Sequence, residues 1–301
     1  MNTMTREPLV SVVINCYNGE EYLSQALESV LSQTYSNWEV IFWDNQSTDK
    51  SAKIFKSYND PRFVYCYAPK HTWLYEARNY AVERTKGEFI AFLDVDDLWL
   101  PEKLESQISL FGDVNIGLVA GDYYEHYEQL GTRQLFTIVV PSHNKIIESL
   151  LQGNFIGMFT IIVRASALKQ LDQPFDASYH IIGDFDMLIR IFENWKLGWV
   201  HQPVGVYRIH GNNESLKRKK MQIDEEASWI VKMKNNAAVS GIKAFKLFSD
   251  MVLYKDAMYF LNQKKLTFAL QKAYTISSYQ LRIRCIIKCL YLSLTKKQLS
   301  N

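Results

Sequence analysis

Three aspartates lie close together in the segment FIAFLDVDDLWLPEKL, residues 89–104. Asp94 and Asp96 are separated by one residue and Asp97 comes next, so their carboxylates could share a divalent cation that in turn holds a phosphate. The same carboxylates could instead form a solvated acidic turn that caps a helix beginning near Pro101. The triplet by itself leaves both interpretations open.

The residues just before these aspartates indicate where the carboxylates lie. Residues 89–93 are a short apolar run, which predicts a strand buried on both faces of a parallel sheet. Ligands of open α/β sheets bind at the carboxyl ends of the strands. Charged side chains at this strand end are therefore placed for chemistry more than for solubility.

Two more side chains could bind parts of a nucleotide. Asp44 follows a predicted strand at 38–43 and could accept a hydrogen bond from the imide N–H of a uracil or thymine ring, or from a ribose. Alternatively, Asp44 belongs to a helix-capping turn with Ser47 and Thr48. Arg78, on the helix that leads into the acidic strand, could pair with a diphosphate through two hydrogen bonds or form a surface ion pair.

Strands and helices are predicted to alternate before the acidic turn. Strands are expected at 10–16, 38–43, 63–67 and 89–93, and helices at 20–33, 51–58 and 74–84. This alternation is typical of right-handed βαβ units and a parallel sheet. Later strand-like runs at 117–123, 135–140 and 160–163 are separated by only short helical pieces, so we expect the sheet to become mixed. A further helix is predicted over 184–192.

The pattern is helical from about residue 215 to the end, in segments near 222–236, 242–262, 264–276 and 279–295. We therefore predict two parts. Residues 1–214 form an α/β domain with a mixed, mainly parallel sheet flanked by helices. Residues 215–301 form a basic, mainly helical C-terminal region.

The net charge of +2 hides a division between these two parts. Residues 1–214 contain 17 Lys and Arg against 27 Asp and Glu, whereas residues 215–301 contain 17 against 5. Such asymmetry favours an anionic partner for the basic part, usually a membrane face or nucleic acid. The segment LRIRCIIKCLYLSLTKK, residues 281–297, could form a basic amphipathic helix at a membrane surface, or it could pack on the catalytic domain or dimerise.

Composition predicts a globular, reduced protein that does not cross a membrane. With 301 residues and 48% hydrophobic residues the chain can bury a sizeable core, and no apolar stretch is long enough to span a bilayer. The four cysteines lack metal-finger spacing, and Cys285 and Cys289 are expected to be half-buried thiols. The opening MNTMTREP lacks the apolar core of a signal peptide, so we expect a cytoplasmic protein.

Several segments in order resemble the signature of glycosyltransferase family 2 on the GT-A (Rossmann-like) fold. They are PLVSVVINCYNGEEYLSQALESVLSQTY, WEVIFWDNQSTDKS and EARNYAVERTKGEFIAFLDVDDLWLPEKL, and the resemblance covers about residues 7–214. It implies that Tyr17, Asn18 and Asp44 lie near the nucleotide, with Asp44 at the base. It also implies that Asp94 faces the ribose and that Asp96 binds the Mn²⁺ or Mg²⁺ that bridges the diphosphate.

Two later segments resemble the remaining motifs of the family. In IIGDFDMLIRI the resemblance makes Asp184 the catalytic base, although Gly183 stands where the family usually has a glutamate. In VYRIHGNNES it directs His210 toward the metal or the diphosphate, whereas a histidine that only stabilises this loop is the alternative. Asn45 and Gln46 also depart from the aspartate and glycine common in the turn after the second strand.

The resemblance implies an inverting, metal-assisted glycosyltransferase in the assembly of a bacterial cell-surface polysaccharide or glycan. Its donor would be a UDP-, dTDP- or GDP-sugar bound by residues that include Arg78, and its acceptor a glycan or a lipid-linked sugar. Peripheral contact with the inner face of the cell membrane and a homodimer are further expectations, and nucleic acid is not an expected partner. A sugar nucleotidyltransferase and a non-catalytic protein that binds nucleotide sugars are the alternatives.

Overall fold

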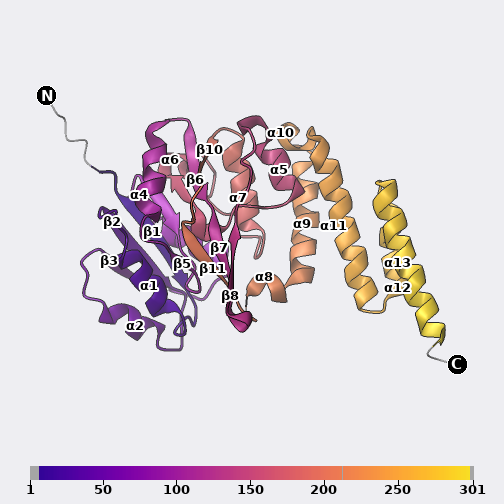
Figure 1. The fold of residues 1–301 in the computed structure, drawn as a ribbon, viewed down its shortest axis with the longest axis horizontal. Helices are drawn as coiled ribbons and strands as arrows, with labels where there is room; N and C mark the ends of the chain where they lie inside the picture. Colours follow the sequence, from indigo (N-terminus) through magenta and orange to yellow (C-terminus); the bar gives the residue numbers. More distant parts are fainter. Residues whose placement is uncertain (1–6, 212, 299–301) are drawn as a thin grey trace. The chain divides into compact units, whose positions relative to one another are not determined.

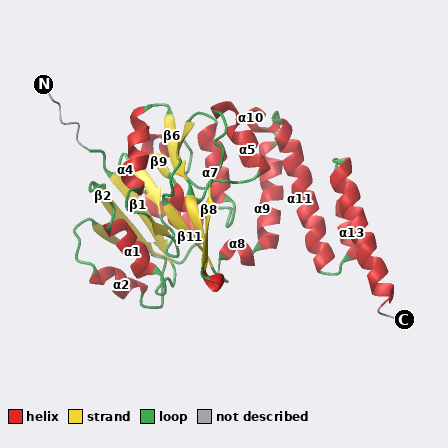
Figure 2. Ribbon diagram, viewed as in Figure 1, coloured by secondary structure: helices red, strands yellow, loops and turns green. Residues whose placement is uncertain are grey.

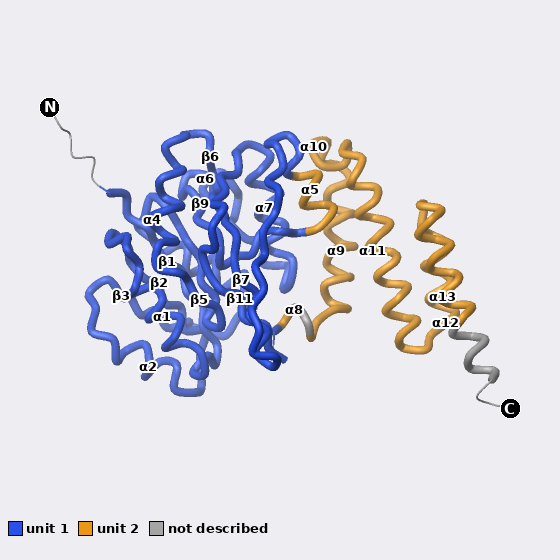
Figure 3. Tube along the Cα trace, viewed as in Figure 1, with its two compact units in different colours: residues 1–146, 154–213 blue, residues 147–153, 214–301 orange. Residues whose placement is uncertain are grey.

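The computed structural model describes residues 7–211 and 213–298, without the side chains of 215, 216 and 292–298. The chain divides into two compact units (Figure 3). Unit 1 comprises residues 1–146 and 154–213, and unit 2 comprises residues 147–153 and 214–301. The sequence analysis assigned residues 147–153 to the first domain, whereas here they belong to the helical unit. The sequence predicts that the opening segment is not a signal peptide. Most of this segment lies outside the described residues.

Unit 1 is built on a seven-stranded sheet with the strand order β10-β6-β9-β4-β1-β2-β3 (Figures 1 and 2). Its strands are β1 (Val10–Cys16), β2 (Trp38–Asp44), β3 (Phe63–Tyr67), β4 (Phe89–Phe92), β6 (Ile116–Gly121), β9 (Ile162–Arg164) and β10 (Lys196–Val200). β1 is parallel to β2 and β4, β2 to β3, and β6 to β10, whereas β9 is antiparallel to β4 and β6. The predicted mixed, mainly parallel sheet is confirmed.

Alternating side chains of the central strands face two different helical layers. Val12 of β1 and Phe42 of β2 belong to one apolar core with residues of α1 (Leu23–Leu31), α2 (Ser51–Ser57) and α4 (Lys103–Ile108). Trp43 points to the other face, where its ring stacks on Tyr80 of α3 (Leu74–Val82) at a centroid distance of 5.5 Å. Because both faces are covered, the strands are apolar almost throughout, as the sequence predicted.

The parallel pairing brings several strand ends to one edge of the sheet. Cys16 at the end of β1 lies opposite Asp44 at the end of β2, which in turn lies opposite Tyr67 at the end of β3. On the other side of β1, Leu93 donates its backbone N–H to the carbonyl oxygen of Val13 at 3.0 Å. The residues that follow β1, β2 and β4 therefore share this edge.

A second sheet of unit 1 reaches the same edge from elsewhere in the chain. Its strand order is β5-β11-β7-β8, formed by β5 (Leu98–Trp99), β11 (Gly205–Ile209), β7 (Tyr123–Tyr127) and β8 (Thr132–Phe136). β5 and β11 are antiparallel, with Gly205 opposite Trp99. The residue that follows β11 therefore lies beside the aspartates that precede β5.

Most of this second sheet was not predicted from the sequence. The strand predicted over 135–140 is wrong, since β8 ends at Phe136, and β5, β7 and β11 were not predicted, nor was β10 of the seven-stranded sheet. The helix predicted over 184–192 is confirmed as α7 (Gly183–Phe192), which follows the short α6 (Ala165–Lys169). Asp184 and Asp186 lie in the first turn of α7, where the helix dipole favours negative charge.

Unit 2 is helical, as the sequence predicted. It contains most of α5 (Ile146–Gln152), together with α8 (Glu214–Lys217), α9 (Lys219–Met233), α10 (Ala237–Ser240), α11 (Lys243–Asn262), α12 (Leu266–Thr275) and α13 (Tyr279–Gln298). Cys285 and Cys289 are free thiols in an apolar core shared by α11, α12 and α13, so they are fully buried where half-burial was predicted. Among the described helices, none is long and apolar enough to cross a membrane.

Candidate active site

A partly buried ion pair joins α3 to the acidic turn after β4. The guanidinium of Arg78 donates to Oδ1 of Asp94 at 2.5 Å, and the Arg78 side chain is only 4% exposed. Burial acts against the charge of Arg78, but nearby carboxylates, chiefly Asp94, outweigh this effect and raise its pKa. The sequence left open whether Arg78 forms an ion pair on the surface. The structure shows that its side chain is buried.

Asp96 faces a histidine that lies 114 residues later in the chain. Its Oδ2 is 3.0 Å from Nε2 of His210, which immediately follows β11. Burial raises the pKa of Asp96, as does the negative charge of Asp94, while contact with His210 lowers it. A residue used only to stabilise its own loop would not reach this carboxylate.

The Asp96 and His210 pair fits a divalent cation that is shared with a phosphorylated ligand. Carboxylate oxygen and imidazole nitrogen are both common metal ligands, and a cation between them would offset the repulsion between Asp96 and Asp94. Within residues 7–211 and 213–298, no group of three or more His, Cys, Asp or Glu is arranged to hold a metal ion. The ligand's own oxygens would therefore complete the coordination, which is how Mg²⁺ is usually bound beside phosphates.

Asp97 has a structural role beside this pair. It is 2% exposed, and its Oδ1 accepts the backbone N–H of Arg208 at 3.0 Å. The Arg208 guanidinium donates from Nε to the carbonyl oxygen of Asp96 at 2.9 Å and from Nη2 to Oε1 of Gln25 at 2.8 Å. Burial raises the pKa of Asp97 well above its ordinary value, because a buried carboxylate is costly to ionise. The charge of Arg208 partly offsets this cost, and its hydrogen bonds fix the turn.

Asp184 lies at the start of α7 and is held by two donors. Its Oδ1 accepts the backbone N–H of Phe185 at 2.8 Å and the hydroxyl of Tyr75 at 3.2 Å. Burial raises the Asp184 pKa, and the Phe185 N–H and the charge of Arg78 only partly oppose this effect. A partly buried carboxylate with a raised pKa suits proton abstraction near neutral pH.

Asp44 is fully buried at the end of β2, and internal groups use both of its oxygens. Oδ1 accepts the backbone N–H of Ser47 at 2.7 Å, and Oδ2 accepts the hydroxyl of Tyr65 at 2.6 Å. The structure thus shows the turn-capping role that the sequence left as an alternative. Contact between Asp44 and a nucleotide base stays a prediction.

Tyr17 and Asn18 follow β1 on the same edge. The Tyr17 side chain is 53% exposed and its ring packs on His71 at a centroid distance of 4.3 Å, which leaves much of the tyrosine ring accessible. Asn18 has a φ of 54°, and its Oδ1 accepts the backbone N–H of Thr48 at 2.8 Å. Tyr17 is thus available to a planar ligand, whereas Asn18 chiefly ties two loops together.

Asn45, one of the departures from the family pattern, uses both ends of its amide. Nδ2 donates to the carbonyl oxygen of Thr72 at 2.7 Å, and Oδ1 accepts the Thr72 backbone N–H at 3.2 Å. An ionised aspartate could not make the first of these hydrogen bonds, because a carboxylate has no donor. The asparagine therefore fixes the loop before α3 in a way that the usual residue could not.

The expected site residues form two groups in the structure. In the first group, Arg78 contacts Asp94 and His210 contacts Asp96. Asp184 lies within electrostatic reach of Arg78 and Asp94. Tyr17, Asn18 and Asp44 gather at the ends of β1 and β2. Sequence reasoning missed Tyr75 and Arg208, since a tyrosine in a helix and an arginine in an unpredicted strand carry no local signal.

The topology of the main sheet, with carboxylates at its edge, is that of the GT-A fold. The family model for Glycosyl transferase family 2 matches residues 11–171, and the chain belongs to this family. A similar protein is UDP-Glc:alpha-D-GlcNAc-diphosphoundecaprenol beta-1,3-glucosyltransferase WfgD of Escherichia coli, 33% identical over 167 residues. These residues are 56% of this chain and 64% of that protein, so the match spans less than two thirds of the relative.

Two solved structures have the same fold. Staphylococcus aureus TarS 1-349 in complex with UDP-GlcNAc has a TM-score of 0.65 at 16% identity, with 89% of this chain and 81% of that chain covered. Mannosyltransferase PcManGT from Pyrobaculum calidifontis, in complex with GDP-Man and Mn²⁺, has a TM-score of 0.58 at 15% identity, with 98% and 88% covered. The predicted GT-A fold is confirmed.

We expect Arg208→Gln to lower the free energy of unfolding by about 2 to 3 kcal/mol, because hydrogen bonds from a charged donor are lost beside the buried Asp97. Urea unfolding followed by fluorescence measures the change. The matched control is Arg133→Gln on β8 of the same sheet, where the side chain is exposed. Equal stability of the two variants would contradict the role assigned to Arg208.

Proposed function

We propose that this protein transfers a sugar from a nucleotide diphosphate sugar to a hydroxyl acceptor with inversion at the anomeric carbon. The observation that carries the proposal is the partly buried Asp184 carboxylate, oriented by Tyr75 and close to the Arg78 and Asp94 pair. Family membership supports transfer of a glycosyl group over the alternative of a nucleotidyltransferase.

The proposed reaction is a direct displacement with Asp184 as general base. Asp184 accepts the proton of the acceptor hydroxyl while the acceptor oxygen forms a bond to the anomeric carbon. The bond from the anomeric carbon to the diphosphate oxygen breaks, and the nucleoside diphosphate leaves with that electron pair. A base on the side of the sugar opposite the leaving group accounts for inversion.

Asp96 and His210 would hold the Mn²⁺ or Mg²⁺, which when bound stabilises the negative charge on the departing diphosphate. Asp94 would face the ribose, and Arg78 would hold this carboxylate in place through the observed ion pair. Tyr17, Asn18 and Asp44 would form the nucleotide end of the donor site. These roles are supported by the positions of Tyr17, Asp44 and Asp94 at the ends of the neighbouring strands β1, β2 and β4.

The acceptor would be a lipid-linked sugar in the assembly of a cell-surface polysaccharide, in line with the diphosphoundecaprenol in the name of the Escherichia coli relative. Such an acceptor is confined to a membrane, so the enzyme would meet it at a membrane surface. We place that contact on α13 of unit 2. The same helix carries the basic segment singled out in the sequence.

The structure separates the two faces of α13. Leu281, Ile286 and the two cysteines pack into the core with α11 and α12. Ile283, Ile287 and Leu290 are 37%, 59% and 54% exposed. One helix thus has an apolar face in the core of unit 2 and a second apolar face open to solvent.

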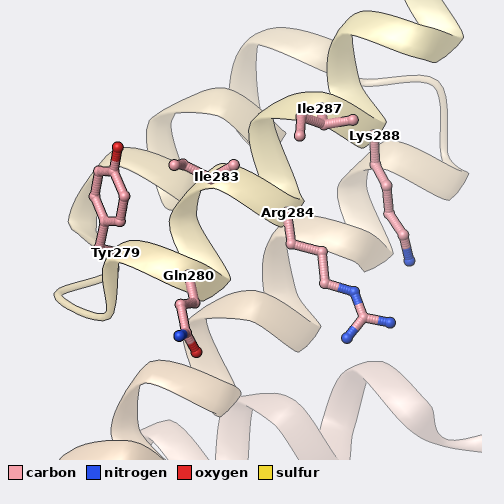
Figure 4. A pocket seen from close by; sticks show the side chains of 6 residues that line it. All are labelled: Tyr279, Gln280, Ile283, Arg284, Ile287 and Lys288. Carbon is pink, nitrogen blue, oxygen red and sulfur yellow. The ribbon is translucent and has the colours of Figure 1, made fainter.

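The exposed face of α13 combines apolar and basic rows (Figure 4). They line a shallow hollow whose side chains are Tyr279, Gln280, Ile283, Arg284, Ile287 and Lys288. Residues four apart share one side of a helix, so the apolar row 279, 283, 287 runs beside the row 280, 284, 288. Residues 257–301 contain eight Lys and Arg and no Asp or Glu. This chemistry fits an anionic lipid surface.

We expect Asp184→Asn to lower kcat by about 100- to 10 000-fold, because the amide cannot accept the acceptor proton. Nucleotide-sugar affinity, measured by calorimetry, should be unchanged. In the wild type, kcat should fall as pH drops through the raised Asp184 pKa, since only the carboxylate is a base. Asp172→Asn, at an exposed site, is the control. Near wild-type turnover by Asp184→Asn would remove the base assignment.

Asp96→Ala should weaken donor binding only when metal is present. The donor is first identified by thermal stabilisation with a panel of UDP-, dTDP- and GDP-sugars. Its dissociation constant is then measured for the wild type and the variant, in Mn²⁺ and in EDTA. The wild type should bind more tightly in Mn²⁺, and the variant should lose this difference. An equal loss of affinity in Mn²⁺ and in EDTA would show that Asp96 is not a metal ligand.

The triple variant Ile283→Ser, Ile287→Ser, Leu290→Ser should lower binding to vesicles that contain phosphatidylglycerol by more than about tenfold, because three apolar side chains no longer enter the lipid. Flotation measures binding, with phosphatidylcholine vesicles as the uncharged comparison. Val231→Ser, 64% exposed on α9, is the control. The opposite outcome is that neither protein binds vesicles, while the wild type is a dimer and the triple variant is a monomer. That result would assign the exposed face of α13 to contact with a second copy of the chain.

A further inference from the structure

Tyr75 connects the helix that carries Arg78 to the segment that carries the base. Its hydroxyl is 2.9 Å from the carbonyl oxygen of Ile181 and 3.2 Å from Oδ1 of Asp184. The side chain is 3% exposed, and its ring stacks on Phe175 at a centroid distance of 5.5 Å. The hydroxyl has a single proton, which these two acceptors share. The ring is therefore held on one side by packing and at its tip by a three-centre hydrogen bond.

The space next to this ring explains the glycine at position 183. A Cβ atom on Gly183 would lie 2.5 Å from Cδ2 of Tyr75, with two more ring carbons at 2.7 Å. Real Cβ contacts essentially never approach this closely, and a rigid, buried ring cannot rotate aside freely. Only glycine admits the ring, so the glutamate that the family pattern places here is incompatible with Tyr75 in its observed position.

The same helix fixes a second part of the site. Arg78 lies one turn after Tyr75 in α3 and binds Asp94, which follows β4. Since both side chains leave one short helix, the position of Asp184 relative to Asp94 depends on the contact of Tyr75 with the start of α7. A shift of that contact would move the base relative to the bound donor.

We propose that Tyr75 is the positioning residue of the catalytic base, and that Gly183 is present because the Tyr75 ring occupies the space of a side chain there. The proposal rests on the proposed function, in which Asp184 accepts the acceptor proton. Tyr75 and Gly183 act as a pair: the ring takes the place of the missing glutamate side chain, and the hydroxyl holds Asp184.

The chemistry of the Tyr75 hydroxyl suits orientation of the Asp184 carboxylate. Burial and the charge of Asp184 raise the Tyr75 pKa well above its ordinary value, so the hydroxyl remains protonated and donates. Because Oδ1 of Asp184 accepts from Tyr75 and Phe185, Oδ2 is the oxygen left for the acceptor hydroxyl. The charged groups that face Asp184 are Arg78, which favours the carboxylate, and Asp94, which opposes it.

Tyr75→Phe tests the proposal without removing the ring. We expect kcat to fall about 10- to 100-fold, the loss typical of one hydrogen bond to a charged group, with KM for the donor unchanged. The acid limb of the kcat profile should move to higher pH, because the hydroxyl no longer stabilises the carboxylate. Tyr80→Phe, whose hydroxyl binds Glu76 on the same helix, is the control.

A double-mutant cycle tests the contact with Gly183. Gly183→Ala should lower kcat in the wild-type background and have a smaller effect in Tyr75→Ala, where no ring opposes the added Cβ. Thermal unfolding of each variant checks that the fold is retained, and Tyr75→Phe alone decides the matter if Tyr75→Ala does not fold.

Two results would overturn the positioning role while the proposed function stands. One is an inactive Asp184→Asn together with a Tyr75→Phe that keeps the wild-type kcat and acid limb. The other is a Gly183→Ala that is equally harmful with and without the ring. A fully active Asp184→Asn is different, since that result would overturn the proposed function itself.

Discussion

Repulsion among carboxylates at one edge of a buried sheet is the constraint on which the site depends. Asp94, Asp96 and Asp97 lie within four consecutive residues, and Asp184 comes within electrostatic reach of Asp94. Burial takes away part of the water that would screen these groups, and it raises the pKa of three of them. The surrounding elements are arranged so that each carboxylate has a cationic or hydrogen-bonding partner.

The partners come from distant parts of the chain and divide the carboxylates by role. Arg78 arrives on α3, and Arg208 and His210 arrive at the end of β11. Arg208 also binds the carbonyl oxygen of Asp96, so the charge that stabilises Asp97 holds the turn in shape as well. Asp97 thus becomes structural, while Asp96 keeps a face toward His210 that suits a cation. The three aspartates are equivalent in the sequence and unequal in the structure.

Departures from the family pattern also have local physical reasons. Asn45 needs an amide because its side chain donates to Thr72 and accepts from it. Gly183 needs the absence of a side chain because the Tyr75 ring fills that space. Each departure fixes α3 or the loop before it, the same helix that carries Arg78. In the sequence these departures appear only as missing carboxylates. In the structure they affect the position of the site residues.

The strands of the parallel core, the amphipathic helices and the strand end that carries the aspartates could all be predicted from the sequence. Those features follow from the local spacing of apolar residues, which reports burial directly. Two contacts depend instead on tertiary packing: the Arg208 backbone of β11 reaches Asp97, and Tyr75 reaches Asp184. These contacts join residues 111 and 109 positions apart. No local period encodes such pairing, because it depends on how whole elements pack against one another.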